Sequence, residues 1–123
     1  MKKLLFALIL VVSVTAACFA EKISDIQQTD SWIYLYNENG KRYKTMSASS
    51  VGEILGWSSS FFVSQKGGWI YLHDSDGKRY KTMSASSVGD VIGVAGNTFT
   101  SRKGGWIYTY DASGKRINTR SAH

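Results

Sequence analysis

The chain has 123 residues and one cysteine, and its fifteen lysine and arginine residues against nine aspartate and glutamate residues give a formal net charge of +6. A single cysteine excludes the small secreted domains that are held together by intrachain disulfides, so a packed core has to stabilise the fold. The positive charge favours anionic surfaces as partners without requiring nucleic acid.

The first twenty residues predict a secretory signal peptide. Lys2 and Lys3 precede an apolar run at 4–12 and then small residues, a pattern that signal peptidase cleaves, here after Ala20. The apolar run is shorter than the roughly 20 residues of a transmembrane helix. A second interpretation is a lipobox in which Cys18 is lipidated. Both predict a secreted, periplasmic or envelope protein of a bacterium, and only the second attaches it to a membrane.

Residues 21–123 predict a single domain built from a repeat of 37 residues. Trp32, Trp69 and Trp106 are spaced by 37, and the segment KRYKTMSASSVG occurs at 41–52 and again at 78–89. Roughly 100 residues are enough for one small domain with its own core. This part of the chain keeps thirteen basic residues against nine acidic ones, a formal charge of about +4.

Each repeat is predicted to form a three-stranded antiparallel meander. The tryptophan segments, such as WIYLY, alternate aromatic and aliphatic residues, which is typical of a strand. Asn37, Asp74 and Asp111 each begin a turn that has glycine at its fourth position, the pattern of a type I turn with a glycine bulge. Glycine pairs at 67–68 and 104–105 predict a second tight turn before the tryptophan segment.

The two connectors between repeats are predicted to be short helices. SVGEILG at 50–56 and SVGDVIG at 87–93 each have a serine followed three residues later by an acidic residue, which matches a capping box. Apolar residues follow at helical spacing, and a glycine ends each segment. We expect about two helical turns in each connector.

The predicted fold class is therefore all-β, with three repeated meanders in a compact pseudo-threefold arrangement and two short helical connectors. An isolated three-stranded sheet is barely stable and leaves both edges open, so we expect the three to share an interior. A β-trefoil, a continuous nine-stranded sheet and a barrel are alternatives that use the same strands.

The predicted hairpin register separates an aliphatic face from a face that pairs aromatic rings with basic side chains. The second and third repeats give the same separation. In the first repeat, Tyr36 is expected opposite Arg42, Tyr34 opposite Lys44, Trp32 opposite Met46, Leu35 opposite Tyr43, and Ile33 opposite Thr45.

The aromatic and basic face has two interpretations. In one, the rings pack under lysine and arginine stems and contribute about 0.5 to 1 kcal/mol per exposed contact. In the other, three equivalent faces are three copies of a binding site, because flat rings stack on sugars and cations meet carboxylate or phosphate. The candidate residues are Trp32, Tyr34, Tyr36, Arg42, Lys44, Trp69, Tyr71, His73, Arg79, Lys81, Trp106, Tyr108, Tyr110 and Arg116.

No catalytic, metal or cofactor motif is present in the sequence, so we expect a protein that is not an enzyme. His73 stands where the other repeats have tyrosine, and His123 is the last residue given. Two such histidines without a neighbouring cysteine do not make a zinc site. The segment DSDG at 74–77 matches the start of a calcium loop, but lysine and arginine follow where oxygen ligands would be needed.

The hairpin GGWIYLHDSDGKRYKTM resembles the aromatic, glycine-turn hairpins of choline- and glucan-binding cell-wall repeats. In those repeats a Trp-Tyr strand precedes an Asp-x-x-Gly turn and a second strand. The resemblance covers about half of each unit, and Arg79, Lys81 and Met83 stand where those repeats carry further aromatic residues. It implies a binding role, and no choline or glucan site is transferred.

We expect a secreted binding module for an envelope glycan or another anionic polymer. The alternatives are a module that binds a protein partner, as an inhibitor or immunity protein does, and a purely structural repeat. A protein partner would depend on positions that break the repeat, such as Trp57, His73 and the pair at 61–62. Nucleic acid is disfavoured by secretion and by the modest charge.

Overall fold

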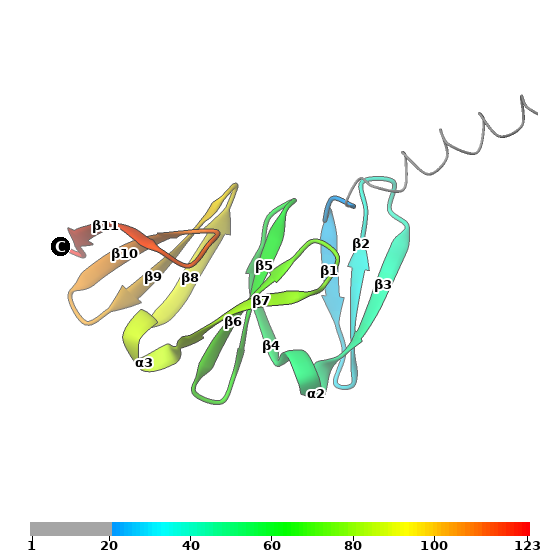
Figure 1. Cartoon of the computed structure of the whole chain (residues 1–123), viewed down its shortest axis with the longest axis horizontal. Helices are drawn as coiled ribbons and strands as arrows, with labels where there is room; N and C mark the ends of the chain where they lie inside the picture. The colour runs from blue at the N-terminus through cyan, green and yellow to red at the C-terminus, as the bar shows by residue number, and fades with distance from the viewer. Residues whose placement is uncertain (1–20) are drawn as a thin grey trace, which may run out of the picture.

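The structure is a computed structural model that describes residues 21–123, and the predicted signal peptide with Cys18 lies outside the described residues. Three antiparallel sheets follow one another along the chain (Figure 1). The sheets are β1 (Asp25–Gln28), β2 (Trp32–Tyr36) and β3 (Arg42–Ser47); β4 (Glu53–Trp57), β5 (Phe61–Lys66), β6 (Trp69–Asp74) and β7 (Arg79–Ser84); and β8 (Asp90–Ala95), β9 (Thr98–Lys103), β10 (Trp106–Asp111) and β11 (Arg116–Ser121).

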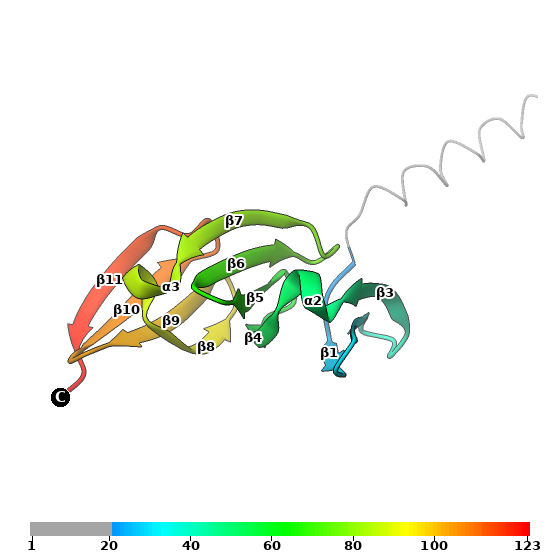
Figure 2. The same ribbon diagram turned by 90° about the horizontal axis from the view of Figure 1, so that it is seen from below.

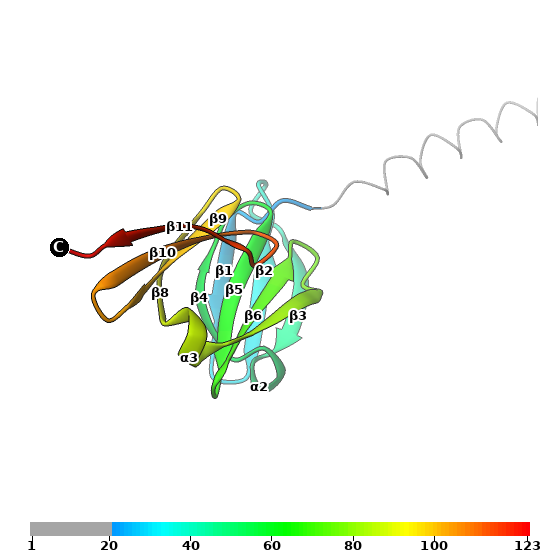
Figure 3. The same ribbon diagram turned by 60° about the vertical axis from the view of Figure 1, so that its left-hand side comes forward.

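The predicted all-β fold of repeated antiparallel meanders with two short helical connectors is confirmed. The connectors carry α2 (Ala48–Val51) and α3 (Ala85–Val88). The described residues form neither a barrel nor one continuous sheet. Figures 1 and 2 show the three sheets in a row in chain order, and Figure 3 looks partly along that row.

The predicted hairpin turns form as the sequence indicates. The side-chain oxygen Oδ1 of Asn37 accepts hydrogen bonds from the backbone N–H groups of Asn39 and Lys41 at 3.0 and 3.1 Å. Asp74 and Asp111 do the same in the other two repeats. The fourth residue of each turn is a glycine with φ between 77° and 92°, a backbone conformation that residues other than glycine rarely adopt.

The predicted register is wrong except at the pair closest to the turn. Tyr36 faces Arg42 as expected, but Leu35 faces Lys44 because Tyr43 is an extra residue in β3, a β-bulge. One extra residue moves every later side chain of β3 to the other face of the sheet. The same bulge occurs at Tyr80 and Ile117. In the first sheet the pairs are Tyr36–Arg42, Leu35–Lys44, Tyr34–Thr45, Ile33–Met46 and Trp32–Ser47.

The connector helices start earlier and are shorter than predicted. Each is a single turn, 48–51 and 85–88, and residues 53–57 and 90–95 are strands. The predicted capping boxes do not form, because their acidic residues lie in β4 and β8. Gly52 ends α2 with φ +90°, and its N–H donates to the Ala48 carbonyl at 2.8 Å. The second and third sheets therefore gain a fourth strand.

The core lies between neighbouring sheets. We call the side of each sheet with Ile33 and Leu35, or their equivalents, the aliphatic face, and the side with Trp32 and Tyr34, or their equivalents, the aromatic face. The aliphatic face of one sheet packs on the aromatic face of the next. One cluster joins Ile23, Ile26, Ile33, Leu35, Ala48 and Val51 to Phe62 of the second sheet, and the other joins Phe61, Val63, Ile70, Leu72 and Val88 to Phe99 and Tyr110 of the third.

We predict that Gly52→Ala destabilises the fold more than Gly40→Ala. Both glycines have positive φ, which costs another residue about 1–2 kcal/mol. A Cβ atom at Gly52 would also clash with the Gln65 carbonyl group, whereas nothing lies within 4 Å of a Cβ atom at Gly40. Chemical denaturation of residues 21–123 measures the difference, and equal stability of the two variants would contradict the close backbone approach at Gly52.

Candidate functional site

The three repeated tryptophans are the most exposed part of the aromatic faces. Trp32, Trp69 and Trp106 are 49%, 51% and 52% exposed. No other sheet among residues 21–123 packs on the aromatic face of the first sheet, yet Trp32 is no more exposed than the other two tryptophans. Neighbouring sheets therefore leave the tryptophans uncovered, and one half-exposed indole per repeat is available to a ligand.

Beside each tryptophan, an arginine lies over a tyrosine ring. The guanidinium carbon of Arg42 is 4.5 Å from the Tyr34 ring centroid, and the second and third repeats repeat the pair at 4.3 and 4.5 Å. These are cation–π distances. A threonine faces each tyrosine across the hairpin. The three sets are Trp32, Tyr34, Arg42 and Thr45; Trp69, Tyr71, Arg79 and Thr82; and Trp106, Tyr108, Arg116 and Thr119.

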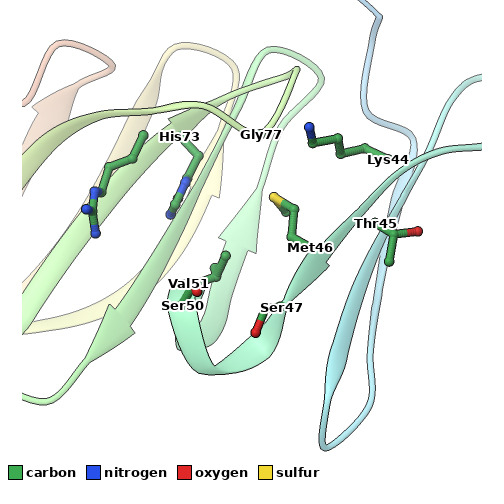
Figure 4. A pocket seen from close by; sticks show the side chains of 9 residues that line it. Lys44, Thr45, Met46, Ser47, Ser50, Val51, His73 and Gly77 are labelled. Carbon is green, nitrogen blue, oxygen red and sulfur yellow. The ribbon is translucent and has the colours of Figure 1, made fainter.

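Two clefts adjoin at Arg79. A shallow one of about 240 Å³ is lined by Trp69, Tyr71, Thr82 and Arg79. A larger one, of about 390 Å³, lies between the first and second sheets. Figure 4 shows Lys44 and Met46 of β3 pointing to the side of His73, and Thr45 pointing away. The residues that line the larger cleft are Lys44, Thr45, Met46, Ser47, Ser50, Val51, His73, Gly77 and Arg79.

His73 forms the inner wall of the larger cleft and is fixed by its neighbours. Its ring stacks on Phe62 with centroids 4.4 Å apart, and its Nε2 lies 3.0 Å from the Ser64 Oγ. The Ser64 hydroxyl donates its hydrogen to the Val51 carbonyl at 2.8 Å. His73 must therefore donate from Nε2, which leaves Nδ1 without a proton and, among the described residues, without a hydrogen-bond partner.

Burial lowers the pKa of His73 from 6.5 to about 4. The Arg79 charge lowers this pKa further, while the Gly77 backbone and the Asp74 charge partly oppose the shift. Lys44, the other cation that lines the cleft, carries a charge of the same sign as protonated His73. His73 is neutral at pH 7, so its contribution there is packing and a hydrogen bond.

Hydroxyl groups of two bulge tyrosines connect neighbouring sheets. Tyr43 Oη donates to the Ser75 carbonyl, and Tyr80 Oη donates to the Ala112 carbonyl. Burial, with nearby acidic groups, raises the pKa of Tyr43 to about 12, and burial likewise raises that of Tyr80. Both hydroxyls therefore keep their protons and stay donors at any physiological pH.

The structure brings together most, but not all, of the residues that the sequence places in each site. Tyr36 is half-buried, and Tyr110 is buried and stacks on Phe99 with centroids 4.9 Å apart. Lys44 and Lys81 lie on the aliphatic face, beside the turn glycines Gly77 and Gly114 of the following sheets. They do not pair with the tyrosines as expected, because the bulge moves them to the other face.

Sequence reasoning missed the threonines and Ser64. Thr45 and Thr82 face the tyrosines where Lys44 and Lys81 were expected. The sequence places these threonines in the sites only if the bulge is already known. Ser64 and its equivalent Ser101 are fully buried and bond to the carbonyls at the ends of α2 and α3. No sequence signal distinguishes these two serines from the many exposed ones.

Among the positions that break the repeat, Trp57 is 36% exposed. Phe61, Phe62 and His73 are buried. No group of three His, Cys, Asp or Glu residues in 21–123 is placed to hold a metal ion. The part of the chain that the structure describes has no helix with the length and apolar character needed to cross a membrane.

Comparison of the chain with protein-family models and with curated proteins finds no match. The geometry of the repeated sites is therefore the basis for a functional proposal.

We predict that His73 makes the fold less stable at acidic pH. The pKa of His73 is about 4 in the folded chain and 6.5 in the unfolded one. Its contribution to the free energy of unfolding is therefore complete above pH 6.5 and is lost as the pH falls from 6.5 to 4. The loss is on the order of 3 kcal/mol.

The variant His73→Tyr introduces the residue that the third repeat has at this position, and it removes the titration. Urea denaturation of the unchanged chain and of the variant between pH 7 and pH 4 gives the free energy of unfolding of each. The unchanged chain should lose more of it than the variant as the pH falls. An identical pH dependence of the two proteins would contradict the burial of a neutral histidine.

Proposed function

We propose that the chain is a secreted, non-enzymatic binding module for an acidic, repetitive glycan of the cell envelope. The observation that carries the proposal is the threefold repetition of one geometry, in which a half-exposed tryptophan lies beside an arginine fixed over a tyrosine. The predicted signal peptide supports a location outside the cytoplasm.

The side chains of each site suit a sugar that carries a negative charge. A half-exposed indole offers a flat apolar surface to the C–H groups of a sugar ring. The arginine has one face on the tyrosine, and its planar edge can donate two parallel hydrogen bonds to a carboxylate or phosphate. Stacking also limits its motion, so less side-chain entropy is lost on binding. The threonine hydroxyl adds a donor and an acceptor.

Repetition adds affinity without new kinds of contact. A single shallow cleft of about 240 Å³ is small for a tight site, since ligand pockets usually measure about 300–1,000 Å³. Three copies of this set of side chains on one chain can bind successive units of a polymer, and binding at the second and third sites is then intramolecular. A polymeric ligand therefore fits the arrangement better than a free monosaccharide.

We predict that the triple variant of Trp32, Trp69 and Trp106 to alanine abolishes retention on the acidic glycan. The measurement is co-sedimentation of residues 21–123 with insoluble peptidoglycan and with acidic and neutral polysaccharides. Single and double variants should lose affinity stepwise, because each removes one of three equivalent contacts. Trp57→Ala is the matched control, since Trp57 is a surface tryptophan outside the three sets.

Retention of the folded triple variant would contradict the site. Loss of binding in one single variant alone would favour a protein partner that contacts one repeat. Replacement of Arg42, Arg79 and Arg116 by glutamine should weaken retention on acidic polysaccharides. Retention on neutral polysaccharides should stay unchanged. The comparison separates the ionic contact of the arginines from the stacking contact of the tryptophans. Circular dichroism and thermal unfolding of each variant control for the fold.

A further inference from the structure

The contact between the first and second sheets is repeated between the second and third. Met46 on the aliphatic face of the first sheet packs against the cluster that contains Phe62. Met83 on the second sheet packs against the cluster that contains Phe99. The tyrosine hydroxyl bonds described above also recur with a spacing of 37 residues. The chain therefore uses one interface twice.

One aromatic face and one aliphatic face are left without a partner sheet among residues 21–123. They are the aromatic face of the first sheet and the aliphatic face of the third. Figure 1 shows that they lie at opposite ends of the row. By the spacing of the repeat, they correspond to the two halves of the interface that the chain already uses twice, except that Ile117 replaces the tyrosine whose hydroxyl bonds to the next sheet.

At these two faces, opposite charges replace the apolar pair of the internal interfaces. Asp25 occupies the position of Phe62 and Phe99, as its pairing with Tyr36 shows, since Phe62 pairs with His73 and Phe99 with Tyr110. Arg120 occupies the position of the two methionines, opposite Ile107. Asp25 is half-buried and Arg120 is exposed. One end therefore carries a negative charge and the other a positive charge, where each internal interface has a phenylalanine and a methionine of the same cluster.

The first sheet as a whole is neutral, with three acidic and three basic residues in 25–47, whereas the third sheet has five basic and two acidic residues in 90–121. Between two copies of the chain, the attraction between the two end faces therefore comes from Asp25 and Arg120.

The end face of the third sheet also exposes large apolar side chains. Ile92 and Ile117 are 58% and 53% exposed. Leu55, the equivalent of Ile92 in the second sheet, packs against the cluster between the second and third sheets. Two exposed isoleucines at positions that elsewhere contact the next sheet indicate a surface that buries apolar area on docking.

We propose that two copies of the chain associate head to tail, with the aliphatic face of the third sheet on the aromatic face of the first sheet of a second copy. Arg120 then pairs with Asp25 of the second copy at the place where methionine meets the phenylalanine cluster inside the chain. The contact is heterologous, so it does not stop at a dimer but forms a ring or a longer row. The row of tryptophan sites continues across the contact.

Polar end faces can also keep repeat proteins apart. Terminal repeats with polar outer faces prevent association in many repeat arrays, and Thr109 at the position of Leu72 fits that role. A polar face of any charge would be sufficient for that purpose. Opposite charges at the two positions that would meet favour association, which is weak and sensitive to salt because the pair is at the surface.

The test uses sedimentation of residues 21–123 over a range of concentrations at low salt. We expect the average mass to rise with concentration, and each reversal, Asp25→Arg or Arg120→Asp, to weaken association by about tenfold or more. The double variant with both reversals, and an equimolar mixture of the two single variants, should associate like the unchanged chain. The neutral variants Asp25→Asn and Arg120→Gln repeat the test with less perturbation if a reversal affects folding.

A monomer at every concentration would overturn the proposal, and so would association that single reversals do not change. Failure of the double variant and of the mixture to recover would show that the two residues do not meet. The outcome does not depend on the glycan proposal, because the measurement contains no ligand.

Discussion

The packing of one sheet's aliphatic face on the next sheet's aromatic face is the interaction on which the rest of the structure depends. A three- or four-stranded sheet on its own has too little buried surface to be stable. Here Ile33 and Leu35 of the first sheet are fully buried against the second, and Ile70 and Leu72 are fully buried against the third. Each sheet therefore needs its neighbour, and the stability of the chain resides between sheets.

This packing also decides which aromatic residues are available to a ligand. Phe62 and Phe99 are buried beneath the preceding sheet, whereas the tryptophans lie beyond the covered area. The tyrosine under the arginine lies between them along the strand, as Tyr71 does between Trp69 and His73, the partner of Phe62. The bulge at Tyr43 has two effects, because it places threonine beside the tyrosine and directs Lys44 to the turn of the following sheet. One extra residue in each hairpin thus shapes both the interface and the site.

Local patterns predicted the local structure well. The repeat, the strands and the Asx-glycine turns follow from residues within a few positions of one another, as Asn37 and Gly40 show. The register could not be predicted, because the extra residue of β3, β7 and β11 has no residue type of its own: it is tyrosine in two repeats and isoleucine in the third. The connector helices were misplaced because pairing of β4 with β5 overrides the helical spacing at 53–57.

The site was predicted in part. Alternation identified the tryptophans and tyrosines as one face, and this assignment did not depend on the register of the partner strand. The burial of His73 and Tyr110 could not be foreseen, because it arises from a neighbouring sheet and both faces of the second sheet carry apolar residues. A period of two cannot separate a buried face from an exposed one when both are partly covered.

The most direct test of three equivalent sites is a titration followed by the indole N–H signals in nuclear magnetic resonance spectra. Each of the four tryptophans gives its own signal, and the ligand is a soluble acidic oligosaccharide. The account predicts that the signals of Trp32, Trp69 and Trp106 shift with similar midpoints, while that of Trp57 stays unchanged. A shift confined to one repeat, or to Trp57, would contradict it.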